Sequence, residues 1–416
     1  MDPGQGARGA QDLDRRHGPD GGHRRHQAGL RRGPAVLRQK AGSRPTQGAG
    51  ATLKERRPVT ESAVAVSFLT DGGQPAERTA TELTEFFQAA GKSLDIAIYD
   101  LHLDGPPAEL VSQAVKAAAQ RGVAIRLLYN VDFPNPIPVP PPPDPDTAFI
   151  AALGVPNRPV PGVPSLMHHK YVVRDAGEDT AAVWTGSTNW TNDSWTREEN
   201  VILRVPSANL AAEYLRNFEE LWSSGRVETS GKYELASVNA TYEGSPVQAR
   251  VLFSPGRGRR MAQLIAMRLG HARRRIRLCS PVITAGPVLG TLADMVKKHV
   301  DFKGVYDRTQ MKEVVSQWVV DPHAAWKAPA FQSVTTGLPF ASKVTTPYAP
   351  GSVHDYMHAK VTVVDDIVLT GSYNLSHSGE ENAENLLELR SQPLADRLAG
   401  FVDAIYARYA GTDAGQ

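Results

Sequence analysis

The sequence predicts an α/β protein built from two similar domains. Segments with strand-like and helix-like periodicity alternate along the chain, which is the pattern of β-α-β units around a parallel or mixed sheet. The same order of segments occurs twice, and a matching motif recurs around His168 and His358, 190 positions apart. Solenoid repeats are far shorter than this, so we expect two like domains packed face to face.

Residues 1–60 are predicted to form a disordered extension. They are dominated by Gly, Arg and Pro, and they cannot bury enough apolar surface to offset chain entropy. Such an Arg-rich tail can bind anionic lipid or nucleic acid, and the alternative is a dispensable extension. Residues 1–57 hold 13 Lys and Arg against 5 Asp and Glu, a balance of +8, in a chain of net charge +2. The remainder therefore carries −6, which argues against a global nucleic-acid footprint without excluding a local basic cleft.

The first domain is expected at residues 62–228. The strand-like "AVAVSFLTDGG" is followed by "ERTATELTEFFQAAG", which has helical spacing and a glycine stop. A buried strand "SLDIAIYDLHL", a helix "PAELVSQAVKAAAQRG" and a strand "VAIRLLYN" come next. The proline-rich residues 134–146 fit neither a helix nor a central strand, so we expect an extended, stiff loop there.

The second domain is expected at residues 247–410 and repeats this order. A strand "ARVLFSPGRGRR", a helix "MAQLIAMRLGHARR", a strand "RIRLCSPVI", a helix "VLGTLADMVKKH" and a strand "VDFKGVYD" follow one another. Each half ends in an amphipathic helix, "ANLAAEYLRNFEELW" and "LADRLAGFVDAIYARY". The polar residues 228–247 are the predicted boundary between the domains.

Several classes of protein are excluded by composition. The single cysteine, Cys279, rules out an internal disulfide framework and a multi-cysteine metal site. No window approaches 18 consecutive apolar residues, and the first residues lack the apolar core of a signal peptide. We therefore expect a cytoplasmic protein without a transmembrane helix.

The chemistry is carried by two copies of one motif. Each copy contains Met-His-x-Lys-x4-Asp, then Thr-Gly-Ser-x-Asn, then Glu-Asn, with the Glu ten residues after the first Asn. The candidate residues of the first copy are His168, Lys170, Asp175, Ser187, Asn189 and Glu199. Those of the second are His358, Lys360, Asp365, Ser372, Asn374 and Glu384. Two copies with matching downstream elements are not expected by chance.

Strand geometry separates the two adjacent histidines of "SLMHHKYVVRD". Side chains at i and i+2 point to the same face, so His168 and Lys170 project together. His169 has the opposite parity and stands where the second copy has Ala359. We therefore expect His168 to do chemistry and His169 to face the core.

This residue set suits a phosphate group. A lysine supplies a point charge to the non-bridging oxygens, and Ser hydroxyls and Asn amides add neutral donors. A carboxylate at the histidine Nδ1 would leave Nε2 free to attack, and Glu199 and Glu384 are the candidates for it. The lysine between the ligand positions and the lack of an acidic cluster argue against a metal, so no metal or other cofactor is expected.

Some residues near the motifs keep two interpretations. Asp175 and Asp365 are candidates for the site, but each could instead end its strand in a turn. Packing is favoured over ligand contact for three tryptophans: Trp184, Trp190 and Trp195. His354 and His377 are expected in a loop or at the rim of the pocket. The run "GRGRR" could clamp phosphate, although a solvated turn is favoured.

The paired motifs resemble the phospholipase D superfamily over roughly residues 62–410. The resemblance implies two α/β/α domains with mixed sheets, related by pseudo-twofold symmetry, with the active site between them. It also implies a phosphohistidine intermediate, with His168 as nucleophile and His358 as general acid. Four residues would hold the phosphoryl group: Lys170, Lys360, Asn189 and Asn374.

The favoured function is a metal-independent phospholipase D-type phosphodiesterase that hydrolyses a phospholipid to phosphatidate and an alcohol. A nuclease or other nucleic-acid phosphodiesterase and a phosphatidyltransferase of the same superfamily remain alternatives, and a silent anion-binding scaffold is disfavoured by the two intact motifs. We expect a phosphodiester substrate, a phospholipid before a nucleic acid, and peripheral contact with a membrane. A monomer is expected because both half-sites lie in one chain.

Overall fold

The computed structural model describes residues 63–131, 145–233, 237–349 and 351–411. The predictions for residues 1–60 and for nearly all of the proline-rich segment 134–146 lie outside these residues. The predicted domain limits, 62–228 and 247–410, stay predictions.

The first half of the chain forms a seven-stranded mixed sheet with the order β1-β9-β7-β6-β2-β4-β5. Its strands are β1 (Ala65–Leu69), β2 (Ser93–Ile98), β4 (Ala124–Val131), β5 (Asn157–Pro161), β6 (Lys170–Arg174), β7 (Ala182–Gly186) and β9 (Asn200–Pro206). Its helices are α1 (Ala76–Gln88), α2 (Gly105–Gln120), α3 (Thr147–Ala152), α4 (Asn192–Thr196) and α5 (Ala208–Ser224). The short strands β3 (Leu101–His102) and β8 (Trp190–Thr191) pair separately. Within the large sheet β2, β4 and β5 pair in parallel with one another, as a β-α-β unit requires, whereas β2 pairs with β6 in antiparallel fashion.

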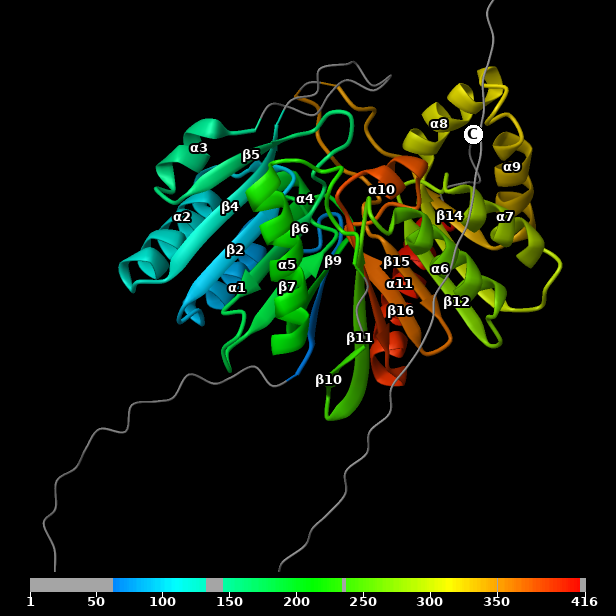
Figure 1. Cartoon of the computed structure of the whole chain (residues 1–416). Coiled ribbons are helices and arrows are strands. Elements are labelled where there is room, and N and C mark those ends of the chain that lie inside the picture. Colours follow the sequence, from blue (N-terminus) through cyan, green and yellow to red (C-terminus); the bar gives the residue numbers. More distant parts are fainter. Residues whose placement is uncertain (1–62, 132–144, 234–236, 350, 412–416) are drawn as a thin grey trace, which may run out of the picture. The chain divides into compact units, whose positions relative to one another are not determined.

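The second half repeats this topology. Its eight-stranded sheet has the order β10-β11-β17-β16-β15-β12-β13-β14, which matches the first sheet strand for strand once β10 is set aside. Its strands are β10 (Val238–Tyr242), β11 (Ser245–Phe253), β12 (Arg275–Ser280), β13 (Asp301–Asp307), β14 (Phe340–Lys343), β15 (Val361–Val364), β16 (Ile367–Gly371) and β17 (Asn385–Arg390). Its helices are α6 (Gly258–Gly270), α7 (Gly286–Met295), α8 (Arg308–Val320), α9 (Lys327–Gly337), α10 (His377–Glu381) and α11 (Gln392–Tyr409). The α/β fold class with two mixed sheets is confirmed (Figure 1).

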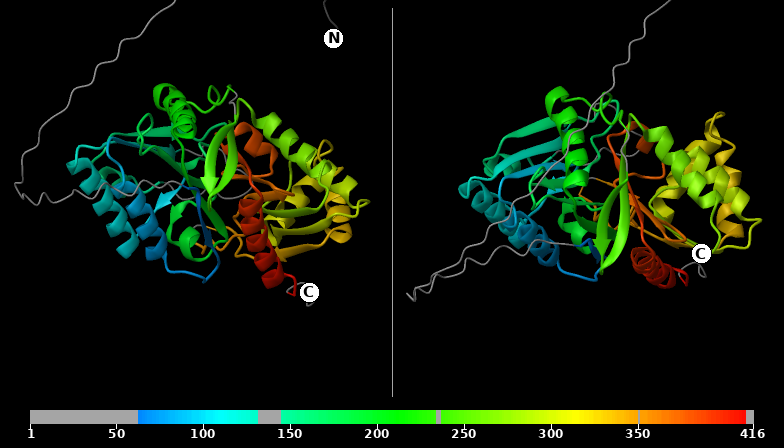
Figure 2. Two further views of the ribbon diagram at one scale, coloured as in Figure 1. Left: turned by 90° about the horizontal axis from the view of Figure 1, so that it is seen from below. Right: turned by 60° about the horizontal axis from the view of Figure 1, so that its bottom comes forward.

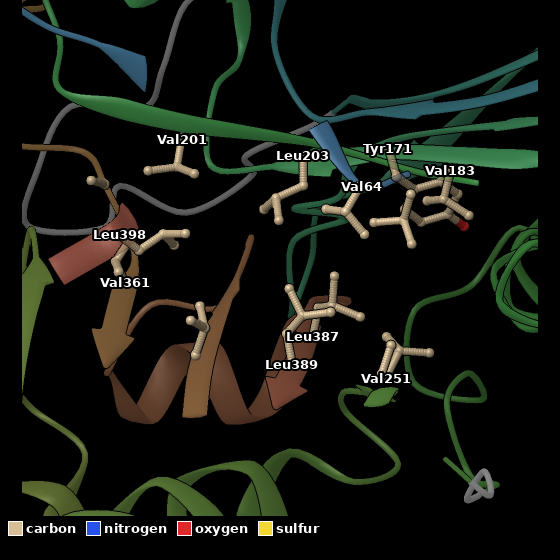
Figure 3. Close-up of a cluster of buried hydrophobic side chains, with 14 of the residues drawn as sticks. Val64, Tyr171, Val183, Val201, Leu203, Val251, Val361, Leu387, Leu389 and Leu398 are labelled. Atoms are coloured by element: carbon tan, nitrogen blue, oxygen red, sulfur yellow. The ribbon is translucent and has the colours of Figure 1, made fainter. Parts of the chain in front are cut away.

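Apolar side chains form three buried clusters, one within each half and one shared between them. The outer face of the first sheet packs on α1 and α2, and the outer face of the second packs on α6 and α7. Figure 2 shows these helices at the two outer sides, in blue and in yellow-green. The inner faces share one core with α5 and α11, and Figure 3 shows Val201 and Leu203 of β9 facing Leu387 and Leu389 of β17. Because one core serves both inner faces, the halves fold as one body around their shared site.

The parity prediction for the motif strands is confirmed. Tyr171 and Val173 of β6 lie in the shared core with Val361 and Val363 of β15. His169 has the same parity and is fully buried, with its ring centroid 4.9 Å from that of Tyr171. The opposite parity carries His168 and Lys170 away from this core.

Candidate active site

The two His-x-Lys motifs meet where β6 and β15 begin. His168 N donates to Ala383 O at 2.9 Å, so the first motif pairs with the segment that leads into β17 of the other half. The second motif likewise pairs with the segment that leads into β9 of the first half, because Glu199 N donates to Tyr356 O at 3.3 Å. This exchange places His168 and His358 at one cleft of about 640 Å³.

Each motif strand is fixed at its start by a polar side chain from a parallel strand. Met167 N donates to Asn130 Oδ1 at 2.8 Å, and Met357 N donates to Asp307 Oδ2 at 3.2 Å. Asn130 is the penultimate residue of β4 and Asp307 ends β13, and these two strands occupy the same place in the two sheets. The histidines therefore sit on a backbone held by buried hydrogen bonds.

The two lysines are buried beside the histidines, and neither is among the residues that line the cleft. Lys170 Nζ donates to His168 O, and Lys360 Nζ donates to His358 O, each at 2.8 Å. Lys170 Nζ also lies 4.6 Å from the ring centroid of Tyr99. Burial lowers the pKa of Lys170 to about 7, and burial with the nearby Lys170 charge holds the pKa of Lys360 well below its usual range. The negative charge of a bound phosphate diester would favour the protonated form of both lysines.

His168 is oriented by a carboxylate from the opposite half. Its Nδ1 lies 2.9 Å from Oε2 of Glu384, which is fully buried at the start of β17. Burial raises the pKa of Glu384 to about 8, while the charges of Lys170 and Lys360 favour its ionised form. A carboxylate that accepts from Nδ1–H leaves the Nε2 lone pair free, which is the form a nucleophilic histidine needs.

His358 has a different set of partners. Its Nδ1 lies 3.1 Å from Oδ1 of Asn200 and 3.3 Å from Oε2 of Glu198. Burial raises the pKa of Glu198 to about 7, and hydrogen bonds from Ser194 and Asn200 oppose the shift. Both side chains are buried, so His358 is held by one amide and one carboxylate.

The prediction that Glu199 orients a histidine is wrong. Its carboxylate accepts from Lys343 Nζ at 2.9 Å and from Tyr409 Oη at 2.5 Å, away from His358. The cause is a one-residue difference between the copies. Gly186 pairs with Ile202, sixteen positions later, whereas Gly371 pairs with Leu386, fifteen positions later.

The extra residue changes which side chain faces the histidine. Val201 N donates to Ser187 Oγ and Asn385 N donates to Ser372 Oγ, so Val201 and Asn385 are equivalent in space. Asn200 therefore takes the place of Glu384. Glu198, from two positions earlier, supplies the carboxylate.

Asp175 and Asp365 are not part of the site, which corrects their candidate catalytic role. Each comes five residues after its lysine, roughly 16 Å farther along the strand. Asp175 accepts from three backbone amides of residues 91–93 at 2.7 to 2.9 Å, and Asp365 accepts from those of residues 273–275 at 2.8 to 3.1 Å. Their φ angles of 51° and 55° are those of tight turns. The turn interpretation therefore holds.

The Gly-Ser-x-Asn turns divide their polar groups between the cleft and the structure below it. Asn189 and Asn374 line the cleft, as predicted for phosphate donors. The Ser187 and Ser372 hydroxyls are fully buried and bond to the following strands, so the structure does not bring these two candidates to the cleft. The preceding glycine is required, because a Cβ on Gly186 would lie 2.1 Å from Val201 O and one on Gly371 would lie 2.4 Å from Asn385 O.

The other residues singled out near the motifs lie either in the wall of the cleft or in the core. His354 and His377 line it, as expected of rim residues, and His354 packs between the rings of Tyr348 and Tyr356. The three tryptophans are buried in the outer core of the first half, which supports packing. The sequence interpretation missed Glu198, Asn200, Tyr99 and Asp100. The doubled glutamate in "TREENV" was the available signal for Glu198.

Two His-Lys half-sites thus exchange orienting side chains across a duplicated α/β fold. The family described as "Cardiolipin synthase, PLD-like domain" matches residues 83–222 and 265–405. Because the two matches cover more than half of the chain, it belongs to this phospholipase D-like family.

Solved structures agree on the fold. Phosphatidylserine synthase from Haemophilus influenzae Rd KW20 superposes with a TM-score of 0.56 and 14% identity, over 82% of this chain and 86% of that one. Polyphosphate kinase from Porphyromonas gingivalis superposes with a TM-score of 0.53 and 11% identity, over 83% of this chain and 50% of that one. A search of curated proteins finds no significant match.

Within the part of the chain that the structure describes, no helix combines the length and apolar character needed to cross a membrane. Among the same residues, no group of three or more His, Cys, Asp or Glu side chains is arranged to hold a metal ion.

Proposed function

We propose that the protein is a phospholipase D-type phosphodiesterase that hydrolyses a phospholipid to phosphatidate and an alcohol. The observation that carries the proposal is the pair of histidines at one cleft, each with its Nδ1 held by a side chain from the other half of the chain. Such a pair can supply a nucleophile and a proton donor to the same phosphorus atom.

In the first step His168 Nε2 attacks phosphorus and the P–O bond to the alcohol breaks. His358 gives its Nε2 proton to the departing oxygen, and Glu384 stabilises the positive charge that develops on His168. Lys170 and Lys360 bind the non-bridging oxygens. Burial lowers the pKa of His358 well below its usual range, and the negative charge of a bound diester opposes that shift.

In the second step water loses a proton to His358 and attacks phosphorus. The P–N bond breaks, and His168 leaves as neutral imidazole. The reaction is therefore balanced without an external acid, and the enzyme returns to its initial protonation state.

The cleft favours a lipid over a nucleic acid. Its described lining includes the carboxylates of Asp100, Glu198, Glu313 and Asp321, and Lys327 is the one lysine or arginine among these lining residues. A polyanionic backbone would be repelled along such a wall, since nucleic-acid binding depends on neutralising several phosphates. Val282, Val314 and Trp318 add apolar surface.

A phosphatidyltransferase is the second candidate. The family's description, "Cardiolipin synthase, PLD-like domain", supports it. The same first step would form the phosphatidyl-histidine, and an alcohol would replace water in the second. The products distinguish the two functions, because only hydrolysis yields phosphatidate when an alcohol is present in excess.

The test is a substrate panel with the purified full chain in EDTA. Vesicles of phosphatidylcholine and of phosphatidylglycerol, with and without added glycerol, are compared with single- and double-stranded DNA. Phosphatidate release that is lost in His168→Ala supports the hydrolase. Transfer to glycerol without phosphatidate would replace it by the transferase, and DNA cleavage without lipid turnover would overturn both.

A further inference from the structure

Helices α8 and α9 carry exposed apolar side chains at the turn that joins them. Val319 is 66% exposed, Val320 80% and Trp326 49%, and together they form what we call the apolar tip. Large apolar side chains with this exposure are uncommon on a soluble surface when they are grouped. Figure 1 shows the two helices side by side, in yellow, at one edge of the second half.

The apolar tip stands beside the mouth of the active-site cleft. Trp318 and Asp321, which are sequence neighbours of the tip valines, line the cleft. Ala324 and Lys327, on either side of Trp326, line it as well. A substrate that enters from a surface in contact with the tip would therefore reach the histidines directly.

The other face of α8 forms a second groove of about 620 Å³. Met311, Val315 and Val319 give it an apolar floor along α8, and Phe331 closes it from α9. Lys312 lies on the same helix face as Val319, seven residues or two turns away, which is roughly 10 Å along the axis. This spacing puts an ammonium group at headgroup depth when the valines reach the acyl chains.

We propose that the apolar tip docks on the surface of a phospholipid membrane, with Val319 and Val320 among the upper acyl chains and Trp326 at the interface. Tryptophan is enriched at this depth because its ring is apolar while its N–H stays hydrated. The proposal rests on the proposed function, since a lipid-cleaving site has to take its substrate from a bilayer. It adds the surface through which the chain does so.

The formal charge of the segment around the apolar tip indicates which lipid composition it should bind. Residues 312–327 contain two lysines, one glutamate and one aspartate, so their formal charge is zero. Docking should therefore need no anionic lipid and should survive high salt, unlike binding through a basic patch. A second copy of the chain is a poorer occupant, because three side chains cannot supply the roughly 800 Å² per partner of a stable protein interface.

The test compares vesicle binding of the wild type with that of the variant Val319→Ser/Val320→Ser. Both valines are exposed, so the variant should keep its melting temperature. We expect its partition onto phosphatidylcholine vesicles to fall at least tenfold, in both 0.1 M and 1 M NaCl. Met267→Ser, which changes another exposed apolar residue on α6, should bind as the wild type does.

Two further measurements keep this test separate from that of the reaction. Turnover of a short-chain phosphatidylcholine below its micelle concentration should be unchanged in the valine variant. Brominated lipid should quench part of the tryptophan fluorescence of the wild type. This quenched part should be missing in the variant Trp326→Phe. A valine variant that partitions onto vesicles like the wild type would overturn the docking surface. The docking surface would also be overturned if the wild type did not bind vesicles but formed a dimer that the valine variant lost. Absence of lipid turnover with normal vesicle binding would overturn only the proposed function.

Discussion

Glu384 of the second half orients His168 of the first, with 2.9 Å between Oε2 and Nδ1. The histidine therefore depends on a residue 216 positions away for its tautomer. Glu384→Gln keeps the shape but removes the charge that stabilises a positively charged imidazole. We expect kcat to fall by about 10²- to 10⁴-fold with KM nearly unchanged, by analogy with loss of the orienting acid in a catalytic triad. Steady-state kinetics on phospholipid vesicles measure this, and a change confined to KM would contradict it.

Glu198 and Glu199 should respond in opposite ways to the same substitution. Glu198→Gln, which alters the partner of His358, should lower kcat by about 10- to 100-fold with little change in melting temperature. Glu199→Gln leaves the buried Lys343 ammonium with a weaker partner and should cost about 3–5 kcal/mol of stability. Its kcat should stay near the wild-type value at temperatures where the chain is folded. The reverse pattern would show that Glu199, and not Glu198, serves the histidine.

Lys170→Met should stabilise the empty protein while abolishing turnover. Burial lowers the pKa of Lys170 from its ordinary 10.5 to about 7, so the unfolded chain binds more protons between these pH values. The penalty on stability is fully present below pH 7 and disappears as the pH rises toward 10.5. The gain in melting temperature of the variant should therefore be largest at pH 6 to 7 and shrink toward pH 10. A gain that is constant with pH, or no gain, would contradict the burial of this charge.

His169→Ala should lower stability and spare the chemistry. The imidazole is fully buried beside Tyr171 and Phe253, and alanine is already present at the equivalent position 359. Loss of a buried ring costs on the order of 2–4 kcal/mol. Thermal unfolding and kcat measured on one preparation separate the effects. Loss of activity in a variant that melts like the wild type would assign His169 a direct role.

Much of the fold can be predicted from the sequence because the two halves carry the same pattern of strands, helices and motifs, so each half supports the interpretation of the other. The paired motifs identify His168 and His358, and strand parity alone separates His168 from His169. The two sheets share one strand order, as a common sequence pattern implies.

The wrong predictions concern positions whose place in space cannot be inferred from the spacing of residues along the chain. Counting ten positions from each Asn made Glu199 the counterpart of Glu384, because an insertion of one residue is invisible without the strand register. Asp175 belongs to the motif in sequence but to a distant turn in space. It comes five residues after Lys170, and five residues of extended strand are long enough to place it well away from the site. The α8–α9 tip has no counterpart motif, so only the folded structure shows it beside the cleft.

The proposed mechanism requires that His168 becomes covalently bound to phosphorus during turnover. The direct measurement is mass spectrometry of peptides from full-length protein quenched in alkali during turnover of a phospholipid, because phosphoramidate bonds survive base. We expect a phosphatidyl adduct on His168, resolved from His169 by fragmentation and absent in His168→Ala. An adduct on His358, or turnover without any histidine adduct, would contradict it.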